Sequence, residues 1–269
     1  MTISDLATLT DRLRFGSRAG WRWRLSLFLP ATLLVGAGLF WLAAPTAAQP
    51  GANCSASFFV NQVLRNGARW QFCWEQRTLD GIVLHDIYFA PPGGGPRRIL
   101  SQASIAQVHV PYDDGSARFH DITDDGFGAE NLNDLTPADC PNGVLLKYGA
   151  KDALCQQIEP RGYAFKGLGT QAQGQALSLF SVSTSGEYNY IPVWRFLDNG
   201  AIEFLMGAAG KLQRYTTDSR FGWPVRTNNT LGTAHIHNYY WRLDFDLGES
   251  GKDDSVDEFN YVPNADNRG

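Results

Sequence analysis

The stretch YNYIPVWRFL-DNG-AIEFLM, residues 188–206, is the part of the sequence that predicts the fold most directly. Its two arms, 188–197 and 201–206, are rich in β-branched and aromatic residues, which favour strands. Between the arms, Asn199-Gly200 supplies the positive φ angles that tight hairpin turns require. We therefore expect an antiparallel β-hairpin at this place.

Further strands are predicted on both sides of this hairpin. Aromatic residues alternate at 70–74, and the turn signal at 79–81 separates them from a β-branched and aromatic segment at 82–89. Another strand is expected at 105–110. The segment 167–175, rich in Gly and Gln, predicts a flexible connection. Closely spaced strands with such turns predict an all-β fold, a β-sandwich.

The composition agrees with a folded, β-rich protein. The chain has 269 residues, of which 43% are hydrophobic and 13% aromatic, enough to fill the core of one large domain or two small ones. Its 28 Gly and 13 Pro suit strands and turns better than helices. The formal net charge is −4, and no run of Lys and Arg occurs, which argues against nucleic acid as a partner.

The N-terminus predicts export. Residues 1–24 carry five Arg against two Asp, and the next 20 residues, 25–44, contain no charged side chain. Such an apolar run is long enough to cross a bilayer, and the preceding arginines favour an N-terminus on the inside. Residues 25–48 are therefore either a cleaved signal peptide or a retained transmembrane anchor. In both cases the domain at 50–269 is expected in the periplasm or outside the cell.

All four cysteines, Cys54, Cys73, Cys140 and Cys155, lie in the expected exported part, where an oxidising compartment would let them pair. Of the three possible pairings, the shortest loops favour Cys54 with Cys73 and Cys140 with Cys155. Free buried thiols are the alternative. No C-x-x-C motif occurs, so neither a zinc site nor a redox site is indicated.

The last predicted strand, 234–247, has two chemically different faces. With a side-chain period of two, one face carries His235, His237, Tyr239, Trp241, Leu243 and Phe245, and the other carries Arg242, Asp244 and Asp246. Two imidazoles two residues apart on a strand project about 7 Å apart in one direction, so both can reach one metal ion. The alternative is that both histidines form hydrogen bonds within the core.

Several blocks of the sequence together resemble the catalytic domain of copper-containing amine oxidases, across roughly residues 68–263. They recur in the same order, and they include the pair of cysteines after residue 139. The blocks are Val110-Pro111-Tyr112, Asp121 to Gly128, Asp139-Cys140, Ala153-Leu154-Cys155, Gly186 to Ile191, and His235 to Asp246.

The resemblance implies a large β-sandwich domain, usually dimeric, that uses dioxygen to convert a primary amine into an aldehyde, ammonia and hydrogen peroxide. In that family a tyrosine of the chain is oxidised to the cofactor topaquinone, and Tyr188 stands at its place. The resemblance also implies that Asp121 is the base that removes the substrate's α-proton. Tyr112 would form a hydrogen bond with the quinone.

The same resemblance implies two kinds of metal site. His235 and His237 stand where the family has two of its three copper-binding histidines. The Asp-x-Asp that follows in the family helps to bind a peripheral, calcium-like ion. This role carries over to the carboxylates of Asp244 and Asp246 and to the carbonyl oxygen of Phe245, all oxygen ligands of the kind that calcium prefers.

The sequence also departs from the family pattern. No histidine follows His237, whereas the family's third copper ligand comes far beyond this motif. Glu187 stands where the family has Asn, and Asn189 stands where it has Asp or Glu, although Thr184 is retained. A carboxylate beside a forming anionic quinone would repel it and oppose cofactor formation.

These departures leave alternatives to an active oxidase. The chain is expected to lack about half of the family's catalytic domain, and the open strand edges would then need a second copy or a complementary segment to cover them. A truncated gene product is also possible. Other interpretations are a catalytically inactive exported β-sandwich that binds a partner or a metal, and a metal-handling protein that uses His-x-His without a quinone.

Overall fold

The computed structural model describes residues 49–115, 118–214, 216–225, 231–247 and 255. By its internal contacts the chain divides into a unit Met1–Thr46 and a unit Ala47–Gly269, and the description concerns the second unit. The basic segment 1–24 and almost all of the predicted signal peptide or anchor, 25–48, lie outside the described residues. Within the described ranges, no helix combines the length and apolar character needed to cross a membrane.

The described chain consists of strands joined by short loops and a few single-turn helices. In chain order these are η1 (Ala56–Phe58), β1 (Phe59–Val63), β2 (Arg69–Arg77), β3 (Gly81–Ala90), β4 (Arg97–Pro111), β5 (Arg118–His120), α1 (Asp121–Asp124), η2 (Ala129–Asn131), β6 (Gly143–Tyr148), β7 (Lys151–Gly167), β8 (Thr170–Phe180), β9 (Ser183–Ser185), β10 (Tyr188–Leu197), β11 (Ile202–Gly210), η3 (Ser219–Phe221), β12 (Gly222–Pro224), β13 (Leu231–Thr233) and β14 (Asn238–Phe245).

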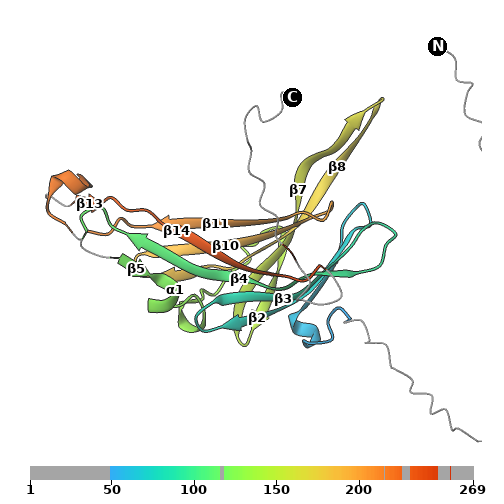
Figure 1. The fold of residues 1–269 in the computed structure, drawn as a ribbon, viewed down its shortest axis with the longest axis horizontal. Helices are drawn as coiled ribbons and strands as arrows, with labels where there is room; N and C mark the ends of the chain where they lie inside the picture. Colours follow the sequence, from blue (N-terminus) through green and yellow to red (C-terminus); the bar gives the residue numbers. More distant parts are fainter. Residues whose placement is uncertain (1–48, 116–117, 215, 226–230, 248–254, 256–269) are drawn as a thin grey trace, which may run out of the picture. The chain divides into compact units, whose positions relative to one another are not determined.

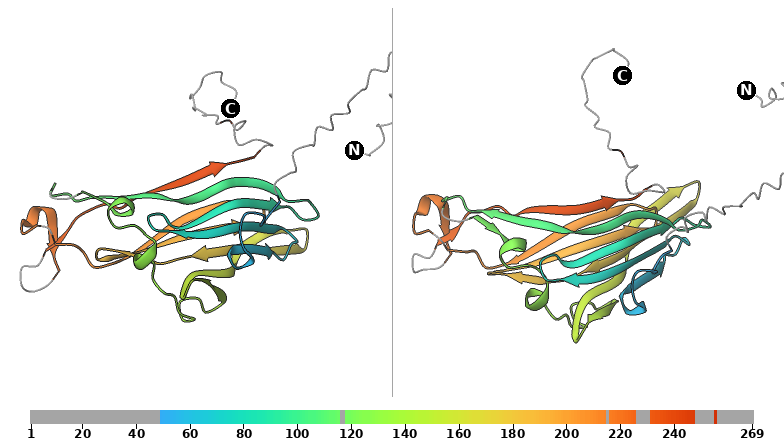
Figure 2. Two further views of the ribbon diagram at one scale, coloured as in Figure 1. Left: turned by 90° about the horizontal axis from the view of Figure 1, so that it is seen from below. Right: turned by 60° about the horizontal axis from the view of Figure 1, so that its bottom comes forward.

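Two six-stranded antiparallel sheets form the two layers of a sandwich (Figures 1 and 2). The first sheet has the order β1-β2-β3-β4-β14, with β5 on β4, and the second has the order β11-β10-β8-β7-β6, with β9 on β10. The strands β12 and β13 pair separately. The prediction of an all-β sandwich is therefore confirmed.

Aromatic side chains from both layers fill the space between the sheets. The ring centroid of Phe196 on β10 lies 5.0 Å from that of Trp70 and 4.8 Å from that of Phe72, both on β2. Trp70 Nε1 donates a hydrogen bond to the carbonyl oxygen of Leu197 at 2.9 Å, which joins the two sheets. Burial of one Phe side chain contributes roughly 1.5–3 kcal/mol. This core fixes the position of β10, the strand that begins at Tyr188.

The hairpin predicted at 188–206 is present as β10 and β11, and its turn differs in one respect. Of the three loop residues, only Gly200 has a positive φ, +89°. The amide of Leu197 donates to the carbonyl oxygen of Ala201 at 2.9 Å. The amide of Gly200 donates to the carbonyl oxygen of Leu197 at 3.1 Å. A three-residue loop needs one left-handed position, which explains why Asn199 does not share the positive φ.

The expectation of a flexible connection at 167–175 is wrong. The strands β7 and β8 pair up to Gly167 and Thr170, and the chain reverses at Leu168 and Gly169, both with positive φ. Figure 1 shows this pair extending past the neighbouring strands as a long arm. A backbone hydrogen-bond ladder forms without apolar side chains, so the Gly- and Gln-rich composition gave no sign of it.

The two strands that flank the candidate site also differ in extent from the prediction. The segment 105–110 is the end of the much longer β4, and the strand expected at 234–247 begins only at Asn238. Ile236 donates its amide to the carbonyl oxygen of Pro111 at 3.3 Å, but Pro111 has no N–H to return the bond. The ladder between β4 and β14 is interrupted there and resumes only as a single bridge between Tyr112 and His235, so His235 and His237 precede the strand.

Both predicted disulfides are present. Cys54 bonds Cys73 on β2, and Cys140, which precedes β6, bonds Cys155 on β7. The described residues contain no free cysteine. Each bridge closes a short loop, and closing such a loop lowers the entropy of the unfolded chain.

Candidate functional site

A cavity of about 320 Å³ opens at the end of the sandwich where β4, β5, α1 and the start of β10 meet. Three of the residues singled out in the sequence, Tyr112, Asp121 and Tyr188, line it together. Its wall is part aromatic and part acidic. The other lining residues are Val110, Phe119, Asp124, Asp125, Ser185, Gly186, Tyr190 and Gln213.

Tyr188 lies between the cavity and the His-x-His segment. Its hydroxyl lies 3.1 Å from His235 Nε2 and accepts a hydrogen bond from the amide of Gln213 at 3.3 Å. His235 Nδ1 lies 2.8 Å from the carbonyl oxygen of Thr233. A carbonyl oxygen only accepts, so Nδ1 carries the proton and Nε2 presents its lone pair toward Tyr188. The ring of Tyr112 stacks on His235 at a centroid distance of 4.7 Å.

Tyr190 connects the carboxylate to the second histidine. Its hydroxyl lies 2.7 Å from His237 Nδ1 and also forms a hydrogen bond with the side chain of Asp121. An ionised carboxylate only accepts, so Tyr190 donates to Asp121 and accepts from His237 Nδ1–H. His237 Nε2 then keeps its lone pair. One hydroxyl therefore orients both the carboxylate and the imidazole.

The rings of the two histidines have a spacing that a shared metal ion allows. Their ring centroids lie 4.8 Å apart. With metal–nitrogen bonds of about 2.0–2.1 Å and roughly 1.2 Å from nitrogen to ring centroid, two imidazoles on one ion at 90–109° have centroids about 4.5–5.2 Å apart. Burial, assisted by His235, lowers the pKa of His237 to about 4, so this imidazole stays neutral and able to bind a metal at neutral pH.

Asp121 has the environment expected of a base. The carboxylate is buried, and burial raises its pKa above the usual value, an effect that the neighbouring Asp125 and Asp124 increase. Hydrogen bonds from Tyr190 and Ser185 oppose the rise but do not cancel it. A carboxylate with a raised pKa is a stronger proton acceptor once it is ionised.

The two residues beside Tyr188 that depart from the family pattern, Glu187 and Asn189, each have a polar partner. Glu187 is exposed, and its carboxylate lies 3.7 Å from Lys211 Nζ in an ion pair at the surface. Asn189 Oδ1 lies 2.8 Å from the hydroxyl of Thr184 on β9. Both side chains are thus engaged elsewhere than at the Tyr188 hydroxyl.

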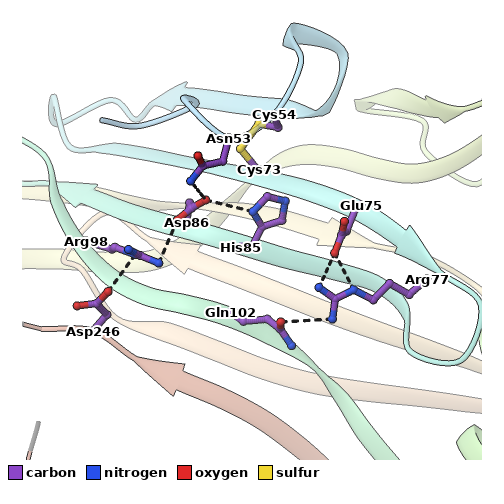
Figure 3. A network of polar contacts seen from close by, with 10 residues as sticks. All are labelled: Asn53, Cys54, Cys73, Glu75, Arg77, His85, Asp86, Arg98, Gln102 and Asp246. Atoms are coloured by element: carbon purple, nitrogen blue, oxygen red, sulfur yellow. Dashed lines mark hydrogen bonds and ion pairs between the residues drawn. A yellow bond between two sulfur atoms is a disulfide. The ribbon is translucent and has the colours of Figure 1, made fainter. Parts of the chain in front are cut away.

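The residues predicted for a peripheral ion do not form an open set of oxygen ligands. Asp246 Oδ2 lies 3.1 Å from Arg98 Nε, and Arg98 also pairs with Asp86 at 3.1 Å (Figure 3). Asp244 and Phe245 are exposed, and a β-bulge between them shifts the register of β14 against β4. A calcium ion would have to compete with a guanidinium group for the carboxylate of Asp246.

Two members of the site were missed by the sequence interpretation. The sequence interpretation assigned no role to Tyr190 or to Ser185, whose hydroxyl donates to Asp125 Oδ2 at 2.5 Å. The position of Tyr190, two residues after Tyr188 on one strand face, was the signal that could have identified it. For Ser185 the sequence holds no comparable signal.

Comparisons with known proteins agree on one family. The family described as "Copper amine oxidase, enzyme domain" matches residues 163–268. Primary amine oxidase 1 of Arabidopsis thaliana is 27% identical over 58% of the chain, the primary amine oxidase of Arthrobacter sp. (strain P1) is 25% identical over 71%, and the human copper-containing diamine oxidase is 27% identical over 70%.

The fold has the same relatives. The crystal structure of the Aspergillus nidulans amine oxidase matches 66% of the chain with a TM-score of 0.55 and 23% sequence identity, and it supports the fold alone. The chain spans about a third of the length of the curated relatives, between 28% and 34% for those described above.

Proposed function

Because the chain is related to the copper amine oxidases, we propose that it takes part in the oxidative deamination of a primary amine. In this reaction the amine, dioxygen and water give an aldehyde, ammonia and hydrogen peroxide. The observation that carries the proposal is that two hydrogen-bond chains lie side by side at one cavity, Tyr188 with His235 and Asp121 with His237 through Tyr190. These residues come from three distant parts of the sequence.

The side chains have distinct roles in the proposal. Tyr188 is the precursor of topaquinone, and its hydroxyl points to the imidazole pair where the oxidising metal would bind. Asp121 accepts the α-proton of the substrate, which its burial favours. Tyr112, stacked on His235 at the cavity wall, orients the quinone by a hydrogen bond.

His235 and His237 would hold copper through their Nε2 atoms. Copper bound there would supply the one-electron chemistry that oxidises Tyr188 and that later returns electrons to dioxygen. The protein itself fixes both imidazoles in the required tautomer, through Thr233 for the first and Tyr190 for the second. The proposal does not include a peripheral calcium ion, because Arg98 already neutralises Asp246.

The proposed setting is an oxidising compartment outside the cytoplasm. The two disulfides support it, because such bonds persist where thiols are not kept reduced. A homodimer, or a complementary segment that completes the site, remains a prediction from the sequence. So does attachment to a membrane through an uncleaved N-terminal segment.

The test is formation of the quinone. We expect protein that is loaded with Cu²⁺ without oxygen to become pink on exposure to air, to react with phenylhydrazine, and to release hydrogen peroxide from a primary amine. The same protein kept free of metal is the control and should stay colourless. Copper binding without colour and without peroxide, across a panel of primary amines, would overturn the oxidase proposal.

Metal binding without turnover is the second candidate function. The 4.8 Å spacing of the His235 and His237 rings favours it independently, because imidazoles at this spacing can share a metal ion whether or not Tyr188 is oxidised. An ion at His235 Nε2 would displace the Tyr188 hydroxyl that contacts this atom at 3.1 Å. Copper that binds with the two histidines while no pink colour develops would support this candidate.

Tyr190→Phe should weaken copper binding without removing a metal ligand. The substitution deletes the hydroxyl that contacts His237 Nδ1 at 2.7 Å and keeps the ring stacked on Phe127. Loss of such an outer-shell partner typically lowers metal affinity about 10–100-fold. Competition with a chelator of known affinity measures the change, and Tyr239→Phe on β14 is the matched control. Equal affinities for wild type and Tyr190→Phe would exclude this role.

A further inference from the structure

A second pair of imidazoles faces each other outside the candidate site. His109, near the end of β4, and His120, the last residue of β5, are direct partners across the antiparallel pair. Their ring centroids lie 4.9 Å apart, and their planes differ by 21°. Within the described residues, neither ring forms a hydrogen bond or an ion pair with another side chain. Directly opposite residues of two strands are the closest side-chain neighbours that a sheet offers.

This pair lies on the face of the sheet that points away from the cavity. Side chains alternate between the two faces of a strand, and Val110 and Phe119, the neighbours of the two histidines, both line the cavity. His109 and His120 therefore project to the other side, where His109 is partly exposed and His120 exposed. The backbone carbonyl of His109 accepts a hydrogen bond from Asn238 on β14, so the position is anchored from both neighbouring strands.

The spacing of the rings is that of a metal chelate. The value of 4.9 Å falls within the range of about 4.5–5.2 Å calculated for two imidazoles on one ion, and it is close to the 4.8 Å of His235 and His237. The two rings are stacked, with planes 21° apart, so their in-plane nitrogen lone pairs do not meet in this arrangement. Binding of one ion by both imidazoles would therefore require both rings to rotate about their side-chain bonds.

We propose that His109 and His120 form a second metal site, a surface bis-imidazole site for a borderline divalent cation such as Cu²⁺ or Zn²⁺. Imidazole nitrogens suit these ions, and Cu²⁺ binds more tightly than Zn²⁺ in the usual order of stabilities. The site is independent of the proposed oxidase centre, because it shares no residue with it. An ion held there would link β5 to β4 immediately before Asp121, the first residue of α1.

Titration of the full chain with Cu²⁺ tests this site, with the number of bound ions and the affinity as readouts. In protein that carries His235→Ala and His237→Ala, one Cu²⁺ should still bind, with an electron paramagnetic resonance signal of nitrogen coordination. His109→Ala or His120→Ala should each weaken this binding at least about tenfold, since loss of an outer-shell partner alone typically costs 10–100-fold. His85→Ala is the control and should leave the affinity unchanged.

A second measurement covers the case in which the double variant does not fold. In wild-type protein, Cu²⁺ should raise the melting temperature, and His120→Ala should bind one ion fewer and lose part of that rise. If His235 and His237 bind no copper, the oxidase proposal fails, but the ion that depends on His109 and His120 should still bind. Binding that is insensitive to both His109→Ala and His120→Ala, or the absence of any ion in the double variant while it is folded, would overturn the second site.

Discussion

Tyr188→Phe is expected to abolish quinone formation and amine turnover completely, because the substituted ring has no hydroxyl to oxidise. The variant should stay colourless with Cu²⁺ in air and should not react with phenylhydrazine. The affected group is the hydroxyl that contacts His235 Nε2 at 3.1 Å and accepts the amide of Gln213 at 3.3 Å. The ring itself remains half-buried between Tyr190 and His237, so we expect the fold to be preserved.

Copper binding separates this prediction from a structural defect. His235 and His237 stay in place in Tyr188→Phe, so the variant should still bind copper and keep a wild-type melting curve. Tyr240→Phe, an exposed tyrosine on β14, is the matched control and should form the quinone normally. Pink colour or phenylhydrazine reactivity in Tyr188→Phe would show that another residue is oxidised and that the assignment is wrong.

Local signals in the sequence were sufficient for much of the fold. The alternation at 70–74, the glycines at the turns and the short spacing between cysteines each depend on interactions within about twenty residues. These signals predicted β2, β3, β10 and both disulfides correctly. The arm formed by β7 and β8 was missed because its β8 half, rich in Gly and Gln, carries few residues that favour strands, although Tyr163 and Phe165 alternate on the β7 half.

The membership of the site depended on resemblance and on tertiary contacts. Asp121 and Tyr188 were identified from the order of the blocks, since nothing local distinguishes them from a turn and a core residue. Tyr190 could not be identified, because its role exists only when Asp121 and His237 reach it from other segments. The pairing of Asp246 with Arg98 likewise joins residues far apart in the chain.

The electrostatics of Asp121 predict how activity and stability depend on pH. Burial raises the pKa of this carboxyl in the folded protein, so folding favours the protonated form. Its contribution to stability is therefore present at low pH and is lost as the pH rises through the raised pKa. Activity has the opposite dependence on pH, because only the ionised form of Asp121 accepts a proton. The acidic limb of the kcat/KM profile should therefore lie at a higher pH than the usual pKa of an aspartate.

Asp121→Asn should lower kcat by about 10²–10⁴-fold, the usual contribution of a positioned general base. The amide has the shape of the carboxyl group and can still accept the hydrogen bond from Tyr190, but it cannot remove a proton. The quinone should still form and react with phenylhydrazine, so the variant would be coloured and nearly inactive. Because a buried charge is removed, its melting temperature at pH 7 should be no lower than that of wild type.

The control for this variant is Asp113→Asn, an exposed aspartate in the loop after β4, which should keep wild-type kcat. Steady-state rates from pH 5 to 9, together with single-turnover reduction of the quinone by amine, isolate the proton-transfer step from reoxidation. The acidic limb of the profile should vanish in Asp121→Asn and persist in Asp113→Asn. A variant at Asp121 that reduces its quinone at the wild-type rate would show that another group removes the proton, and the network through Tyr190 would then serve only to orient His237.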